Sequence, residues 1–180
     1  MSWGSFDYKG QVRDLTHLDP FTINVTPKAP GAPTWTVRVS FSHHTFTREL
    51  QPGDGPQDEY AVGSDVRCFC TDRYPLSLSL PGIIQANANG RAYFTQGHNL
   101  MFVENIPGLQ QGPYAIFFNM ERARKLKGID ATMFVVSAYE KPGLPPMRSL
   151  RAITMPTLVA KTLGQQPITN TRAKRRWKGK

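Results

Sequence analysis

Apolar and polar residues alternate most regularly in the segment 34–41. Its apolar positions are Trp35, Val37, Val39 and Phe41. Successive side chains of a strand point to opposite faces, so this pattern predicts a strand with one buried face. Shorter alternating or apolar runs predict further strands at residues 21–26, 66–70, 91–95 and 100–104, the last two joined by a turn at 96–99.

The longest apolar pattern spans residues 114–142 and predicts two strands joined by a basic turn. The second strand is apolar from Met133 until Ser137 interrupts it, and Tyr139 follows. On a regular strand Ser137 and Tyr139 would share the face of Met133 and Val135. The hydroxyl and the phenol either bond a neighbouring strand, as buried polar groups usually do, or belong to a functional site.

Proline and glycine positions predict two helical stretches. Asp72 and Pro75 suit the cap and first turn of a helix, which Pro81 would bend or restart. A last helix is expected at Pro156–Leu163, because Pro156 suits a first helical turn and Gly164 follows the last apolar residue.

Together these elements predict the α+β class, with an antiparallel sheet of about five to six strands and one or two packed helices. The expected organisation is an irregular N-terminal segment at 1–33, one domain at 34–164, and a basic, disordered tail at 165–180. Residues 51–59 are expected to form an exposed acidic loop. A chain of 180 residues can bury a core of this kind without disulfides.

The two cysteines, Cys68 and Cys70, are too few for a disulfide framework and predict a reducing, cytoplasmic setting. No apolar run is long enough to span a bilayer, so no membrane partner is expected. The N-terminus also lacks the layout of a secretory signal.

The net charge of +9 is concentrated near the C-terminus, where the last ten residues hold six lysines or arginines and no acid. These basic residues are Arg172, Lys174, Arg175, Arg176, Lys178 and Lys180. A second basic group lies in the predicted turn of the long hairpin and comprises Arg122, Arg124, Lys125 and Lys127. Such groups favour nucleic acid by releasing counterions from phosphates, although solvated charge runs are common without a ligand. The turn residues would form a basic rim of the site.

No metal and no cofactor is predicted. The chain contains no Walker loop, GxGxxG, GxSxG or HExxH motif. A zinc site from His43, His44, Cys68 and Cys70 is conceivable, but neither pair has the usual spacing of zinc ligands.

Two segments contain candidates for phosphate chemistry. In SHHTFTRE, His44 and Arg48 share a face whether the segment is helical or extended. Histidine can move protons near neutral pH, and arginine can hold a phosphate. Arg73 precedes the first predicted helix and is a second candidate cation. Each has a structural alternative: His44 could hydrogen-bond the backbone, and Arg73 could form a salt bridge to Asp72 or Asp65.

The boxes FSHHTFTRE, FCTDRYPLSLSLPGII and VVSAY resemble those of proteins encoded by bacterial and prophage genomes, a likeness that covers most of the chain. The order of an early histidine-arginine box, an arginine before a helix and a late hydroxyl-x-Tyr is similar to that of the metal-independent ribonuclease superfamily that includes barnase, EndoU and RelE-type toxins. The second resemblance implies that His44 is the base or acid, that Arg48 and Arg73 bind phosphate, and that Ser137 and Tyr139 complete a catalytic site.

The sequence therefore favours a nucleic-acid-directed protein of bacterial or prophage origin, most concretely a toxin-like, metal-independent endoribonuclease. RNA or another nucleic acid and an inhibitor or partner protein are the expected partners. The alternatives are a non-catalytic protein that binds nucleic acid or a partner, and a phage structural or assembly protein. The enzyme hypothesis requires His44, Arg73, Ser137 and Tyr139 to meet in one cleft.

Overall fold

The computed structural model describes residues 2–95 and 100–164. Its main sheet is formed by β3 (Phe21–Val25), β4 (Trp35–Phe41), β8 (Arg91–Phe94), β9 (Leu100–Glu104), β10 (Tyr114–Arg122), β11 (Ala131–Glu140) and β12 (Ala152–Thr154). Among the described residues this sheet has seven strands in the order β12-β8-β9-β10-β11-β4-β3. The α+β class is confirmed. The strands predicted at 21–26, 34–41, 91–95, 100–104 and within 114–142 are present in this sheet, whereas the strand predicted at 66–70 lies in a second, smaller sheet. The turn predicted at 96–99 lies outside the described residues.

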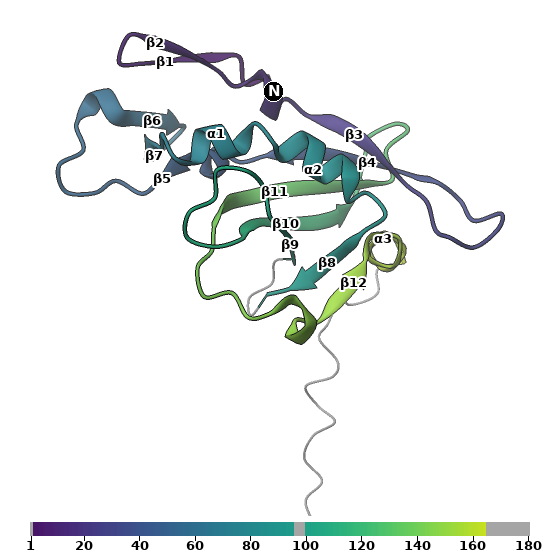
Figure 1. Cartoon of the computed structure of the whole chain (residues 1–180). Coiled ribbons are helices and arrows are strands. Elements are labelled where there is room, and N and C mark those ends of the chain that lie inside the picture. The colour runs from purple at the N-terminus through teal and green to yellow at the C-terminus, as the bar shows by residue number, and fades with distance from the viewer. Residues whose placement is uncertain (1, 96–99, 165–180) are drawn as a thin grey trace, which may run out of the picture.

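The sheet departs from the predicted antiparallel arrangement at one pair, because β4 and β11 run in parallel. The other neighbouring strands of the sheet are antiparallel. A parallel pair needs a long connection between its strands, and residues 42–130 supply it. Consequently the C-terminal ends of β4 and β11 lie at the same end of the sheet (Figure 1).

One face of the sheet is covered by helices α1 (Arg73–Ser77), α2 (Leu80–Ala86) and α3 (Met155–Leu163). Figure 1 shows α1 and α2 following one another across the sheet, with α3 beside β12. The core on this face includes, with exposures of 0%, Val37, Val39, Ile116, Phe118, Met133, Val135, Leu80, Ile84 and Leu158. The alternation predicted for β4 therefore identifies its buried side chains correctly.

The helix boundaries follow the prolines and glycine as predicted. The first helical stretch stops at Ser77 and restarts at Leu80, with Pro81 in the new first turn. In α3, the Thr154 hydroxyl accepts a hydrogen bond from the Thr157 N–H, and Gly164 follows the last turn. These are positions where proline costs no hydrogen bond and where a side-chain oxygen can satisfy a free N–H group.

The N-terminal segment is more ordered than predicted. Residues 1–33 contain a hairpin of β1 (Ser5–Tyr8) and β2 (Gln11–Asp14), the 3-10 helix η1 (Thr16–Leu18) and β3. Leu15 and Leu18 are fully buried in the main core. Their burial holds the N-terminal segment against the core, although its prolines had predicted an irregular structure.

A second, three-stranded sheet stands beside α1. It consists of β5 (Thr47–Arg48), β6 (Glu59–Val62) and β7 (Asp65–Phe69) in the order β5-β7-β6, and the 3-10 helices η2 (His43–Thr45) and η3 (Pro56–Asp58) flank it. The connector before β12 contains a further 3-10 helix, η4 (Met147–Ser149). The segment 51–59 is not a wholly exposed acidic loop, because Asp58 is buried and bonded to the Tyr8 hydroxyl and the Lys9 ammonium.

A β-bulge at Val136 corrects the predicted orientation of the end of β11. Phe118 pairs with Val135, whereas Phe117 pairs with Ser137, so one extra residue lies between them. Adjacent residues of β10 face opposite sides, and the side chain of Ser137 therefore lies on the face opposite to Val135. Ala138 takes the fully buried position instead. The prediction that Ser137 and Tyr139 share the face of Val135 is wrong for this reason.

Burial predicts different effects of substitution at two neighbouring positions of β11. Met133 is fully buried, whereas Phe134 is 44% exposed. We expect Met133→Ala to lower the free energy of unfolding by about 2–5 kcal/mol, and Phe134→Ala to change it much less. Urea denaturation of the two variants checks this, and equal losses would contradict the opposite orientation of these two side chains.

Candidate functional site

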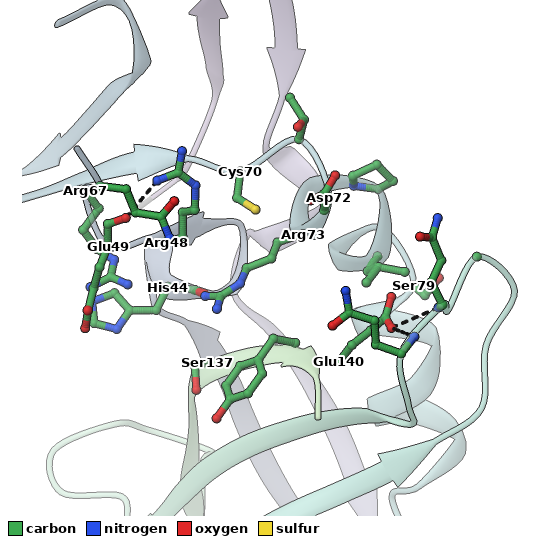
Figure 2. Close-up of a pocket in the computed structure, with 18 of the residues that line it drawn as sticks. His44, Arg48, Glu49, Arg67, Cys70, Asp72, Arg73, Ser79, Ser137 and Glu140 are labelled. Carbon is green, nitrogen blue, oxygen red and sulfur yellow. Dashed lines mark hydrogen bonds between the residues drawn. The ribbon is translucent and has the colours of Figure 1, made fainter. Parts of the chain in front are cut away.

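A pocket of about 1070 Å³ opens where η2, β5, β7, α1 and the end of β11 meet (Figure 2). All five residues predicted as catalytic line it: His44, Arg48, Arg73, Ser137 and Tyr139. They come from four elements that are far apart in the sequence. Figure 2 shows Arg73 reaching from α1 across the pocket toward His44, with Ser137 on the adjacent wall.

The histidine turn η2 is attached directly to β11. The Ser42 N–H donates to the Val135 carbonyl at 2.9 Å, continuing the parallel pairing by one residue. Within the turn, the Ser42 hydroxyl accepts from the His44 N–H at 3.2 Å, and the Thr47 hydroxyl donates to the His43 carbonyl at 2.8 Å. These bonds explain why SHHT forms a tight turn at this point.

His44 is paired with a carboxylate, Asp65, and the sequence patterns did not predict this pair. Its Nε2 lies 2.9 Å from Oδ2 of Asp65. Asp65 begins β7 directly after a two-residue hairpin turn, in which Gly63 adopts a φ of 60°. The hydrogen bond from His44 lowers the pKa of the Asp65 carboxyl. The pair resembles a base and its orienting carboxylate.

Arg73 carries a charge that no carboxylate of the described residues neutralises within ion-pair distance. The expected alternative of a salt bridge to Asp72 or Asp65 is therefore not formed. One of its nitrogens, Nη1, donates to the carbonyls of Thr47 at 2.6 Å and His44 at 3.3 Å. The guanidinium also lies 5.0 Å from the centre of the Tyr139 ring. Burial lowers the pKa of Arg73, as expected for a cation removed from water.

Arg48, by contrast, is already paired with a carboxylate. Both of its terminal nitrogens lie 2.6 Å from the carboxylate oxygens of Asp54. This bidentate pair holds the pKa of Asp54 well below its usual range and raises the pKa of Arg48. Arg48 lines the pocket as predicted, but its geometry favours a structural role in closing the loop that carries Asp54.

Ser137 and Tyr139 are half-buried and follow the bulge. The Tyr139 ring stacks on Phe117, with the ring centres 5.3 Å apart. The Ser137 hydroxyl forms no hydrogen bond with another residue of the described ranges. The alternative of a serine hydroxyl satisfied by a neighbouring strand is therefore not what the structure contains.

The pocket also includes residues that the sequence patterns did not indicate. Arg67 lies beside His44 in Figure 2, and its Nε donates to the Thr47 hydroxyl at 3.1 Å. Glu140 accepts hydrogen bonds from the N–H groups of Gln110 at 3.0 Å and Gln111 at 2.6 Å. This fixes the loop after β9 as one wall. The sequence contained one signal for Arg67 as a pocket residue, namely that it is a charged residue within the predicted strand 66–70.

The basic turn of the long hairpin does not form a rim of this pocket. Tyr114 pairs with Glu140 at the pocket end, whereas Arg122 pairs with Ala131 at the other end of the nine-residue strand β10. At about 3.3 Å per residue the two ends are roughly 25–30 Å apart. Arg122 donates instead to the carbonyl of Leu163 at the end of α3. The predicted nucleic-acid-binding residues Arg172, Lys174, Arg175 and Arg176 lie outside the described residues.

Comparison with protein families identifies the family of this chain. The pattern of the YjaZ family matches residues 5–176, which is nearly the whole sequence. The chain belongs to the YjaZ family. This agrees with the predicted membership of a bacterial protein family that extends over most of the chain, and it brings no evidence for a likeness to the ribonuclease superfamily.

Searches of the curated proteins and of the solved structures found no match to this member of the YjaZ family. Within residues 2–95 and 100–164, no helix has the length and apolar character needed to cross a membrane.

The Arg48–Asp54 pair predicts a pH-dependent contribution to stability. The folded-state pKa of Asp54 is depressed, so its contribution should be complete above the ordinary carboxyl pKa of about 3.9 and should decline as the pH falls toward the folded-state pKa. We expect wild type to be more stable than Asp54→Asn at pH 7, with a difference that shrinks in acid. Urea unfolding across that range measures it. A difference that does not vary with pH would contradict the assignment.

Proposed function

We propose that this protein binds RNA in the pocket and cleaves it as a metal-independent, toxin-like endoribonuclease in the bacterial cytoplasm. The observation that carries the proposal is the partly buried Arg73 guanidinium, which has no carboxylate partner among the described residues and shares a pocket with His44, Ser137 and Tyr139. These residues supply a base, an acid and a cation. RNA cleavage needs these groups when its own 2′-hydroxyl attacks the neighbouring phosphodiester.

Electrostatics supports an anionic ligand. Removing a guanidinium from water is unfavourable, and folded proteins usually compensate it with a carboxylate or another anion. Among the described residues, the Arg73 guanidinium donates to the carbonyl oxygens of His44 and Thr47 and lies over the Tyr139 ring. Arg67 adds a further positive charge to the lining of the pocket. A phosphate group would offer both arginines the anionic oxygens that this geometry leaves missing.

The His44–Asp65 pair supports proton transfer. If Nε2–H of His44 donates to Asp65, then Nδ1 carries the lone pair and can accept the 2′-hydroxyl proton of a ribose. The 2′-oxygen then attacks phosphorus, the bond from phosphorus to the 5′-oxygen breaks, and that oxygen takes a proton. The products are a 2′,3′-cyclic phosphate and a 5′-hydroxyl, so atoms and charges balance without water.

The remaining side chains suit positioning and protonation. Arg73 would stabilise the charge that develops on the equatorial oxygens of the phosphorane. Ser137, whose hydroxyl is not engaged by the described residues, could donate a hydrogen bond to one of them. Tyr139 could stack on a base or protonate the leaving oxygen.

Incubation of labelled RNA with the protein in EDTA tests the proposal. Wild type should release fragments ending in 2′,3′-cyclic phosphate, and His44→Ala should reduce the rate by about 10²- to 10⁴-fold, the usual contribution of a general base. His17→Gln is the matched control, because His17 hydrogen-bonds Ser77 and does not line the pocket. No cleavage by wild type, or equal rates in wild type and His44→Ala, would contradict the proposal.

A non-catalytic nucleic-acid-binding function is the second candidate, and the basic hairpin turn favours it. Arg122, Arg124, Lys125 and Lys127 lie on the surface, far from the pocket. These residues could bind phosphates without any participation of His44.

If the hairpin turn binds nucleic acid, the double substitution Arg124→Gln, Lys127→Gln should flatten the dependence of affinity on salt. The logarithmic slope should change by about 0.7 for each phosphate of a single strand that the variant no longer neutralises. Fluorescence anisotropy with a 2′-deoxy oligonucleotide measures the slope. An unchanged slope would exclude this turn as the binding surface, and Arg38→Gln, a single-charge change on β4, is the control.

A further inference from the structure

Two adjacent histidines and one aspartate converge at the edge of the pocket. Nε2 of His43 and Nε2 of His44 lie 3.0 Å and 2.9 Å from the same oxygen of Asp65, its Oδ2. All three atoms lie within 4.8 Å of one another. The proposed cleavage uses His44 and Asp65 but assigns nothing to His43.

His43 is the unexplained member of this cluster. Its side chain is only 9% exposed, and although its Nε2 lies 3.0 Å from the Asp65 oxygen, that atom has no aligned hydrogen-bond partner among the described residues. A buried polar atom without a partner is costly and rare in folded proteins. The contact with Asp65 is thus an ion-pair approach whose alignment does not satisfy the buried nitrogen.

We propose that His43, His44 and Asp65 form a binding site for one divalent transition-metal ion of the Zn²⁺ or Co²⁺ type. The site goes beyond the proposed function and does not rest on it. Two imidazole nitrogens and one carboxylate oxygen suit borderline ions of this kind. With metal–ligand bonds of about 2.0–2.2 Å, ligand atoms on one ion are roughly 3–3.5 Å apart, so small shifts would accommodate it.

The backbone around the three ligands is already positioned. Hydrogen bonds from Thr47 and Arg73 hold the carbonyls of His43 and His44. The tight turn at Gly63 places Asp65 at the start of β7. Asp65 is 47% exposed, which gives an ion a route from solvent. Three protein ligands leave at least one coordination position, and His44 lines the pocket, so this position would border the phosphate-binding region.

The cysteines that accompanied these histidines in the sequence are not members of the cluster. Cys68 is buried, with its thiol donating to the Phe69 carbonyl, and Cys70 lines another part of the pocket. Asp65, the first residue of β7, takes their place, with its Oδ2 at 3.0 Å from His43 Nε2 and 2.9 Å from His44 Nε2. The ligand set is therefore nitrogen and oxygen, without sulfur.

Two consequences distinguish this site from the proposed cleavage. Arg67 lies beside His44 in the pocket, so its positive charge would oppose a bound cation. A metal on Nε2 of His44 also places the proton of that neutral ring on Nδ1, which then cannot act as a base. Metal binding and metal-free cleavage should therefore exclude each other.

Titration of chelator-treated full-length protein with Co²⁺ and Zn²⁺ tests the site, with calorimetry for affinity and visible absorption for the ligands of Co²⁺. We expect one ion per chain, and at least about 10-fold weaker binding in His43→Gln and Asp65→Asn. Asp72→Asn is the control, because Asp72 lines the pocket and loses the same charge without belonging to the cluster. Arg67→Gln should bind the ion more tightly.

Equal affinity in wild type and Asp65→Asn, absence of binding, or strong thiolate-to-cobalt absorption would overturn the proposed site. Circular dichroism of each variant separates loss of ligands from loss of fold, and Asp65→Asn is the decisive variant because that side chain is half-exposed. RNA cleavage in EDTA by a protein that binds no metal would refute this site alone. Metal binding by a protein that cleaves no RNA would refute the proposed function alone.

Discussion

The parallel pairing of β4 with β11 is the constraint on which the site depends. Because the two strands run in the same direction, the turn that follows β4 lies at the same end of the sheet as the C-terminal end of β11. The hydrogen bond from Ser42 to Val135 extends this pairing into the histidine turn. An antiparallel pair would have placed His44 at the opposite end of the sheet from Ser137. The meeting of the two segments is thus a result of strand direction.

The bulge at Val136 has a second, local effect. It changes which residues of β11 face the core, so that Ala138 is buried and the polar side chains of Ser137 and Tyr139 are released from it. A bulge disrupts the ladder, and bulges are frequent where a strand must redirect a side chain toward a site. The apparent anomaly of a hydroxyl in an apolar strand is resolved by this extra residue.

The arginines of the pocket differ in their electrostatic state, although they look alike in the sequence. Arg48 is neutralised by Asp54 through two short hydrogen bonds, whereas Arg73 donates to carbonyls, lies over an aromatic ring and has no carboxylate partner among the described residues. The first contributes to loop structure and the second leaves an unbalanced positive charge in a concave site. Both histidines approach the same Asp65 oxygen, but only His44 meets it with hydrogen-bond geometry among the described residues.

The sequence alone indicated most strands of the main sheet, the helices, and the five candidate catalytic residues that line the pocket. Alternation identified β4 because side chains of a strand obey a period of two, and prolines with a terminal glycine located α1, α2 and α3 because their backbone preferences are local. Local patterns also indicated four candidate site residues, because each is a polar or charged side chain that interrupts its surroundings: His44, Arg73, Ser137 and Tyr139. Only the tertiary structure decided which strands are parallel, where the bulge falls and which carboxylate meets each cation. Those outcomes depend on contacts between distant segments, such as Asp65 with His44, and no local pattern encodes them.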